Sequence, residues 1–83
     1  MTGGSERERR RTALPDGLTS RQLDYLRLLA QGKTNKAIAG TLVVSEAAVE
    51  TMLVRLYEKI RVRNRAEAIR YAYDHGLIDA SSP

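Results

Sequence analysis

Apolar residues recur at helical spacing in four stretches of the chain, and no window alternates regularly between apolar and polar residues. Residues three and four apart lie on one face of a helix, so these stretches indicate helices with one buried face. They predict helices at about 19–31, 35–42, 46–61 and 65–75 and no strand. We therefore predict an all-α fold of four helices.

Residues with capping chemistry stand where the predicted helices begin and end. Thr19 is followed three positions later by Gln22, and Asn64 by Glu67, which is the spacing of a capping box. Gly76 follows the last predicted helix and is typical of a Schellman motif. These local signals support the helix boundaries independently of the apolar pattern.

The two ends of the chain lack the apolar residues needed for a core. Residues 1–16 combine Gly, Ser, Pro and charges, and they predict a disordered basic arm or the remnant of a linker. Residues 80–83 predict a short frayed tail. The folded domain is then expected at 17–79, with a helix-turn-helix at about 34–53.

The composition excludes most catalytic and metal sites. The 83 residues include no Cys and one His, so thiol chemistry, Cys-based zinc sites and disulfides are impossible. No apolar run reaches the roughly 18–20 residues of a membrane span, and the N-terminus lacks the apolar core of a signal peptide. We expect a cytoplasmic protein that is not an enzyme, with no cofactor, metal, membrane contact or small-molecule substrate.

The net charge of +4 is concentrated in one part of the chain. Residues 55–70 hold six basic side chains against two acidic ones, whereas the other segments nearly balance. Such asymmetry is typical of a nucleic-acid footprint, although a solvated helix face would explain the charge equally well.

The third predicted helix has an outward face suited to a DNA groove. With Val49 at the centre of the buried face, a step of about 100° per residue turns a set of mostly small side chains outward. The outward residues are Ala47, Thr51, Val54 and Glu58, and they are flanked by Ala48, Glu50 and Arg55. Small side chains allow close approach to base edges and thymine methyl groups.

Eight segments between residues 18 and 78 fit one known pattern in a single register. They are Leu-Thr-Ser-Arg at 18–21, Leu-Leu-Ala-Gln-Gly at 28–32, Thr-Asn-Lys-Ala-Ile-Ala at 34–39, Leu-Val-Val-Ser at 42–45, Ala-Val at 48–49, Lys-Ile-Arg-Val at 59–62, Arg-Ala-Glu-Ala-Ile at 65–69 and Gly-Leu-Ile at 76–78. Together they resemble the LuxR/FixJ (GerE-type) helix-turn-helix domain of bacterial response regulators and quorum sensors.

The resemblance implies transcription regulation at paired half-sites of double-stranded DNA, with the third helix in the major groove. With the basic segment that follows that helix, it gives the expected DNA-binding residues Thr34, Asn35, Lys36, Ser45, Ala47, Ala48, Glu50, Thr51, Val54, Arg55, Lys59, Arg61 and Arg63. It also implies a weak homodimer through the last helix, where a stripe at i, i+3, i+4 and i+7 is expected to form the contact. This stripe is Ala68, Tyr71, Ala72 and His75, and the alternative is that Tyr71 covers its own domain.

The chain departs from the family pattern at functionally important positions. The family usually has Glu where this chain has Gln22, Lys where it has Glu50, and Gly where it has Arg61. The Glu50 carboxylate either weakens binding by repelling phosphates or accepts a hydrogen bond from cytosine N4. The sequence leaves both interpretations open.

Two other functions fit parts of the pattern. One is a protein-interaction module on a degenerate helix-turn-helix scaffold, motivated by Glu50 and Ala48 in the reading helix. The other is promoter recognition similar to region 4 of a sigma factor, which also pairs a helix-turn-helix with a basic helix. RNA polymerase is a candidate partner in the regulator and sigma-like functions.

Overall fold

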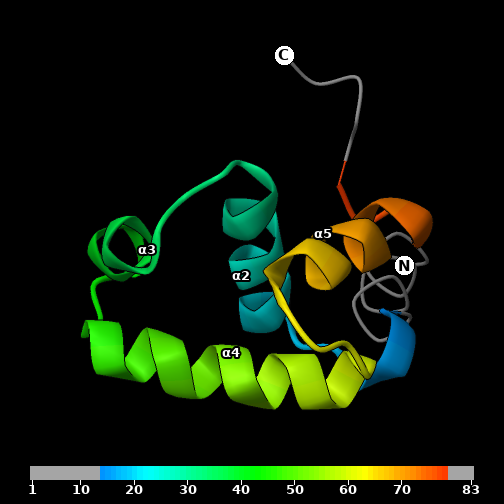
Figure 1. Cartoon of the computed structure of the whole chain (residues 1–83), viewed down its shortest axis with the longest axis horizontal. Coiled ribbons are helices and arrows are strands. Elements are labelled where there is room, and N and C mark those ends of the chain that lie inside the picture. Colours follow the sequence, from blue (N-terminus) through cyan, green and yellow to red (C-terminus); the bar gives the residue numbers. More distant parts are fainter. Residues whose placement is uncertain (1–13, 79–83) are drawn as a thin grey trace, which may run out of the picture.

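The computed structural model describes residues 14–78, which form a 3-10 turn and four α-helices. The elements in chain order are η1 (Pro15–Gly17), α2 (Ser20–Ala30), α3 (Asn35–Leu42), α4 (Glu46–Ile60) and α5 (Arg65–Asp74) (Figure 1). No strand occurs in this part of the chain. The all-α prediction with four helices is confirmed.

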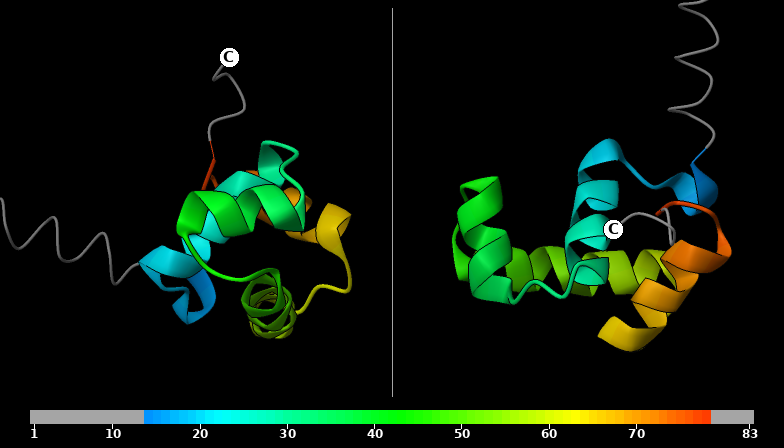
Figure 2. Two further views of the ribbon diagram at one scale, coloured as in Figure 1. Left: turned by 90° about the vertical axis from the view of Figure 1, so that its left-hand side faces the viewer. Right: turned by 90° about the horizontal axis from the view of Figure 1, so that it is seen from above.

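The longest helix, α4, lies along one side of the domain, and the other elements lie across it (Figures 1 and 2). α3 crosses near the N-terminal end of α4, and η1 and α5 lie toward its C-terminal end. α2 stands between them and packs mainly on α5. One long face of α4 is therefore left uncovered by the other helices.

The core is built from apolar side chains of every helix. Its members are Leu18, Tyr25, Leu26, Leu29, Ile38, Ala39, Val49, Leu53, Leu56, Ile60, Ala68, Tyr71 and Ala72. α4 buries Val49, Leu53, Leu56 and Ile60, as its apolar stripe predicted. Burial of each such aliphatic side chain stabilises the fold by about 1.5–3 kcal/mol.

The two predicted capping boxes differ in the structure. At α2, the Gln22 N–H donates to Thr19 Oγ1 and the Thr19 N–H donates to Gln22 Oε1, both at 3.0 Å, which confirms the first box. At α5, the Glu67 N–H donates to Asn64 Oδ1 at 2.9 Å, but the Glu67 carboxylate accepts from the Arg63 N–H at 2.7 Å. The Glu67 side chain thus accepts from the N–H of Arg63, one residue before the predicted donor Asn64. The backbone of Asn64 is almost fully extended (φ −156°, ψ 176°).

Helix ends use the left-handed conformation both with and without glycine. Gly76 (φ 67°) closes α5 as the predicted Schellman motif, with the Leu77 N–H donating to the Ala72 carbonyl at 2.9 Å. Val43 (φ 58°) and Arg61 (φ 61°) adopt the same conformation after α3 and α4. A non-glycine residue there costs roughly 1–2 kcal/mol, so packing and backbone hydrogen bonds must hold these two positions.

α3 and α4 meet at a bend of 103° across residues 43–45. This angle falls within the range of roughly 90–120° that is characteristic of a helix-turn-helix. No single helix within residues 14–78 has both the length and the hydropathy of a membrane span. Only α3 and α4 taken together, as this bent pair, reach that length and hydropathy.

Part of the predicted N-terminal arm belongs to the domain. Leu14 packs against the core and Asp16 bonds to α5, although both were assigned to the disordered segment 1–16. Residues 1–13 and the predicted tail at 80–83 lie outside the described residues.

Candidate nucleic-acid interface

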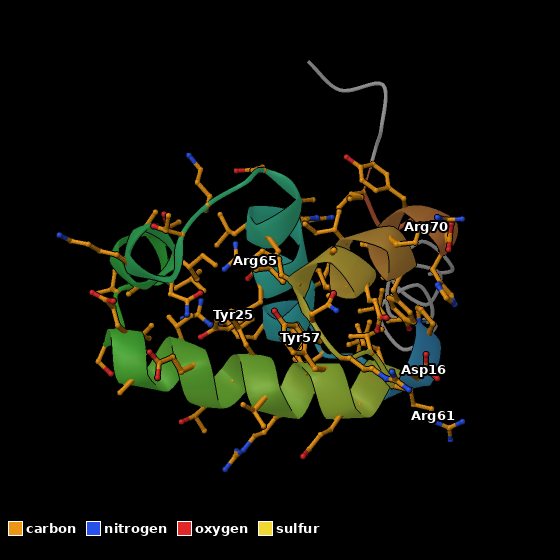
Figure 3. The ribbon with its side chains drawn as sticks, in the orientation of Figure 1. Asp16, Tyr25, Tyr57, Arg61, Arg65 and Arg70 are labelled. Atoms are coloured by element: carbon orange, nitrogen blue, oxygen red, sulfur yellow. The ribbon has the colours of Figure 1, made fainter. Side chains whose placement is uncertain are left out.

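Most of the α4 residues that are predicted to contact DNA bases lie on the uncovered face of this helix. Figure 3 shows its side chains projecting away from the other helices. We define the outward strip of α4 as Ala47, Glu50, Thr51, Val54 and Arg55, all of which are exposed. Val54 is a large apolar residue that is 56% exposed, and the neighbouring Ala48 is half-buried. The strip is a ridge of short, mostly neutral side chains along one helix.

Two predicted DNA contacts, Thr34 and Ser45, use their side chains as helix caps. Thr34 Oγ1 accepts from the Ala37 N–H at 3.1 Å at the start of α3. Ser45 Oγ accepts from the Ala48 N–H at 3.0 Å at the start of α4. The two hydroxyls therefore fix the two helices of the motif, so their first role is structural.

The predicted basic contacts divide into side chains without an internal partner and tethered ones. Lys36, Arg55, Arg61 and Arg63 are exposed, and their side chains make no hydrogen bond or ion pair within residues 14–78. Lys59 instead donates to the Gly17 carbonyl at 3.2 Å and to Gln22 Oε1 at 3.1 Å. It joins the end of α4 to η1 and α2, an intramolecular role that was not predicted.

Arg65, at the start of α5, reaches across to the connection between α2 and α3 (Figure 3). Its guanidinium donates to the Lys33 carbonyl at 2.6 Å and to Asn35 Oδ1 at 2.9 Å. Burial raises the pKa of the nearby Tyr57, and the positive charge of Arg65 partly offsets that rise. Arg65 thus orients Asn35, a predicted DNA contact, at the first position of α3.

The predicted dimer stripe is mostly inside the domain. Ala68 and Ala72 are fully buried and Tyr71 is buried, which leaves only His75 exposed. The Tyr71 hydroxyl donates to Asp16 Oδ2 at 2.5 Å, and its ring stacks on that of His75 with the centroids 4.0 Å apart. The stripe is therefore not a surface for a second protomer, and Tyr71 covers its own domain because η1 and α2 pack on this face of α5.

The bond between Asp16 and Tyr71 adds to the effect of burial on the pKa of the phenol. Burial raises the pKa of Tyr71, and the hydrogen bond to Asp16 and the carboxylate charge raise it further. The hydroxyl stays protonated and remains a donor at any pH near neutrality. We refer to the bonds of Lys59, Arg65 and Tyr71 together as the anchoring contacts.

A family model described as bacterial regulatory proteins of the luxR family matches residues 16–72 of this chain. The chain belongs to the LuxR family. It is 43% identical over 63 residues to the transcriptional regulatory protein MctR of Rhizobium johnstonii, an alignment that covers 76% of this chain and 29% of MctR. It is 33% identical over 72 residues to the response regulator protein VraR of Staphylococcus aureus, which covers 87% of this chain and 34% of VraR.

This LuxR-family chain spans about a third of the length of these relatives. The match confirms the resemblance in the sequence and coincides with the part of the chain that folds into η1 and the four helices. Helix-turn-helix domains of this family belong to transcriptional regulators, so the family supports DNA binding as the general class of function.

Two residues of this LuxR-family domain have structural roles that were not predicted, and each has a signal in the sequence. Asp16 lies within Pro15-Asp16-Gly17, a sequence typical of a tight turn, which η1 provides. Arg65 stands at the N-terminal end of a helix, where a positive charge opposes the helix dipole. A cation is disfavoured at such a position unless another contact compensates, as the bonds to the Lys33 carbonyl and Asn35 do here.

Proposed function

We propose that this chain is the DNA-binding domain of a bacterial transcription regulator, with α4 in the major groove of double-stranded DNA. The observation that carries the proposal is the outward strip of α4, which is exposed and which nothing in residues 14–78 covers. A major groove admits one α-helix, and the short side chains of the strip let the helix approach the base edges. The proposal includes no enzymatic activity, cofactor or small-molecule substrate.

The exposed cations supply the affinity for the phosphate backbone in this proposal. Lys36 lies at the start of α3, and Arg55 lies on the strip itself. Arg61 and Arg63 follow the end of α4. If each protomer of a dimer neutralises about four phosphates, log K should fall with log salt with a slope of roughly −7. Lys59 is left out of this set because its ammonium group is already bonded.

Dimeric binding remains part of the proposal, on a different face of α5 from the one predicted. Ile69 is half-buried and Tyr73 is 43% exposed, and they lie one turn apart next to the exposed Arg70. This surface is small, so the homodimer is expected to be weak without DNA. Two protomers would read half-sites about one helical turn apart. An activating regulator would also contact RNA polymerase, in the cytoplasm at the nucleoid.

A selection from random duplexes at low salt tests the proposal directly. The 83-residue chain is expected to enrich one sequence pattern, and a salt titration on the selected duplex is expected to give the slope above. Arg55→Ala should lower the affinity several-fold and reduce the slope by about 2, because a dimer loses two phosphate contacts, without loss of helicity. Arg27→Ala is the matched control, because this exposed arginine lies in the last turn of α2, and that end of α2 points away from α4 (Figure 1).

The second candidate function is protein binding, and the acidic start of α4 favours it. Glu46 and Glu50 are both exposed there, where a DNA-binding helix would face phosphates. Glu50→Lys discriminates between the two. Non-specific duplex binding by this variant, with none by the wild type at low salt, would show that the strip serves a protein partner instead.

A further inference from the structure

Glu50 is an exposed carboxylate without a partner in the domain. It lies in the second turn of α4, and its side chain makes no hydrogen bond or ion pair with residues 14–78, where Arg70–Asp74 is the only ion pair. Helical spacing explains this, since neighbours within reach on a helix lie three or four positions away. At these positions α4 has Glu46, Ala47, Leu53 and Val54, none of which is basic.

We propose that Glu50 is a specificity residue that selects a cytosine in each half-site. This inference rests on the proposed function, in which the outward strip enters the major groove. Phosphates repel a carboxylate there, and a hydrogen bond donated by a base offsets that repulsion. The donors in the groove are the N4 amino group of cytosine and the N6 amino group of adenine.

The hydrogen-bond acceptors beside each amino group decide whether a carboxylate prefers cytosine or adenine. Adenine presents its N7 acceptor beside the N6 donor, so a carboxylate that binds N6 also brings an oxygen toward N7. Cytosine presents only a donor at its own edge. An amide side chain, which has both an acceptor and a donor, matches adenine instead. Glu50 therefore favours cytosine over adenine, and over guanine and thymine, whose major-groove polar atoms are acceptors.

The neighbours of Glu50 permit this contact and add a second one. Ala47 and Thr51 are short, so they do not hold the helix away from the bases. Val54 lies one turn further along α4 and is 56% exposed, which suits contact with a thymine methyl group. Four helical residues advance about 6 Å, or about two base-pair steps. The proposed half-site thus holds a cytosine and, about two base pairs away, a thymine.

The test compares selections from the same random duplex library with three forms of the 83-residue chain. The wild type is expected to show one position in each half-site at which cytosine is preferred by about five- to 150-fold. Glu50→Gln is expected to shift this preference to adenine. Glu58→Gln is the matched control, because it removes the same charge from the exposed face of α4 two turns further along, beyond the outward strip, and should keep the wild-type preference.

The outcomes separate this inference from the function on which it rests. Sequence-specific binding by Glu50→Gln with the wild-type preference at every position would overturn the role of Glu50 and leave the DNA-binding function standing. So would a wild-type pattern that contains no preferred cytosine. A wild type that enriches no sequence and binds no duplex at low salt would instead overturn the proposed function itself.

Discussion

The outward strip of α4 and the anchoring contacts use charged side chains in opposite ways. On the strip, Glu50 and Arg55 have no partner among the described residues. In the anchoring contacts, Lys59 and Arg65 donate to backbone carbonyls and to side-chain oxygens of elements distant in the sequence. Residue type alone therefore does not show which charged side chains of this domain are available to a partner. The presence or absence of an internal hydrogen-bond partner separates the two groups.

Among the substitutions that distinguish the anchoring contacts from the outward strip, Arg65→Ala is expected to have the largest effect on stability. The change removes two charge-assisted hydrogen bonds that join α5 to the start of α3, so the free energy of unfolding should fall by about 2 kcal/mol. Urea denaturation measures this. Arg65→Lys should recover little of the loss, because an ammonium group does not reproduce the planar two-pronged contact.

Arg63→Ala is the control for that measurement. Arg63 is exposed, and its side chain bonds to nothing in the described part of the chain, so the substitution should change stability by less than about 0.5 kcal/mol. Equal losses for the two arginines would remove the distinction between tethered cations and those without a partner in the described part of the chain.

The next largest effect is expected from Tyr71→Phe, which removes the bond to Asp16 and should cost about 1 kcal/mol. The sign of the pH dependence follows from the raised pKa of Tyr71. The folded domain keeps the phenol protonated while the unfolded chain loses that proton near pH 10, so wild-type stability should fall as the pH rises above about 10.

Tyr71→Phe should lack the part of this alkaline loss that Tyr71 causes. Tyr57, whose pKa is also raised, remains in both proteins and contributes equally to each. Denaturation at pH 8 and at pH 10.5 compares them. Parallel losses in the two proteins would contradict a protonated Tyr71 as the anchor of η1.

The smallest effect is expected from Arg61→Gly, and it should have opposite signs in the two assays. Glycine relieves the left-handed strain at φ 61° but gains freedom in the unfolded chain, so stability should rise by about 0.5 kcal/mol. DNA affinity should fall a few-fold because one exposed cation is lost. Arg61→Lys retains both the charge and the strain and should leave both measurements near the wild-type values. A loss of stability in Arg61→Gly would show that the Arg61 side chain packs on the domain.

Local signals made the helices predictable. The stripe from Val49 to Ile60 follows the helical period over about three turns, and Thr19 and Gln22 cap α2 by contacts within one turn. Such features depend only on neighbouring residues. The sequence therefore predicts the outward strip as well, since it is the opposite face of the same helix.

The anchoring contacts could not be predicted in this way, because they join residues far apart in the chain. Lys59 and Gln22 are 37 positions apart, and Tyr71 and Asp16 are 55 apart. The error on α5 has a related cause. Two neighbouring stripes on α5 have the same helical period, one beginning at Ala68 and the other at Ile69. Only the packing of α2 and η1 against α5 decides which of the two stripes is buried.

The left-handed residues Val43 and Arg61 bracket α4 and have a consequence for the thermodynamics of recognition. Each ends the preceding helix through a backbone bond, from the Val44 N–H to the Ala39 carbonyl at 3.0 Å and from the Val62 N–H to the Tyr57 carbonyl at 2.9 Å. The length and direction of α4 are therefore set before any duplex arrives. Calorimetry of binding should then show a heat-capacity change that reflects the surface buried against DNA, without the added contribution of a helix that forms on contact.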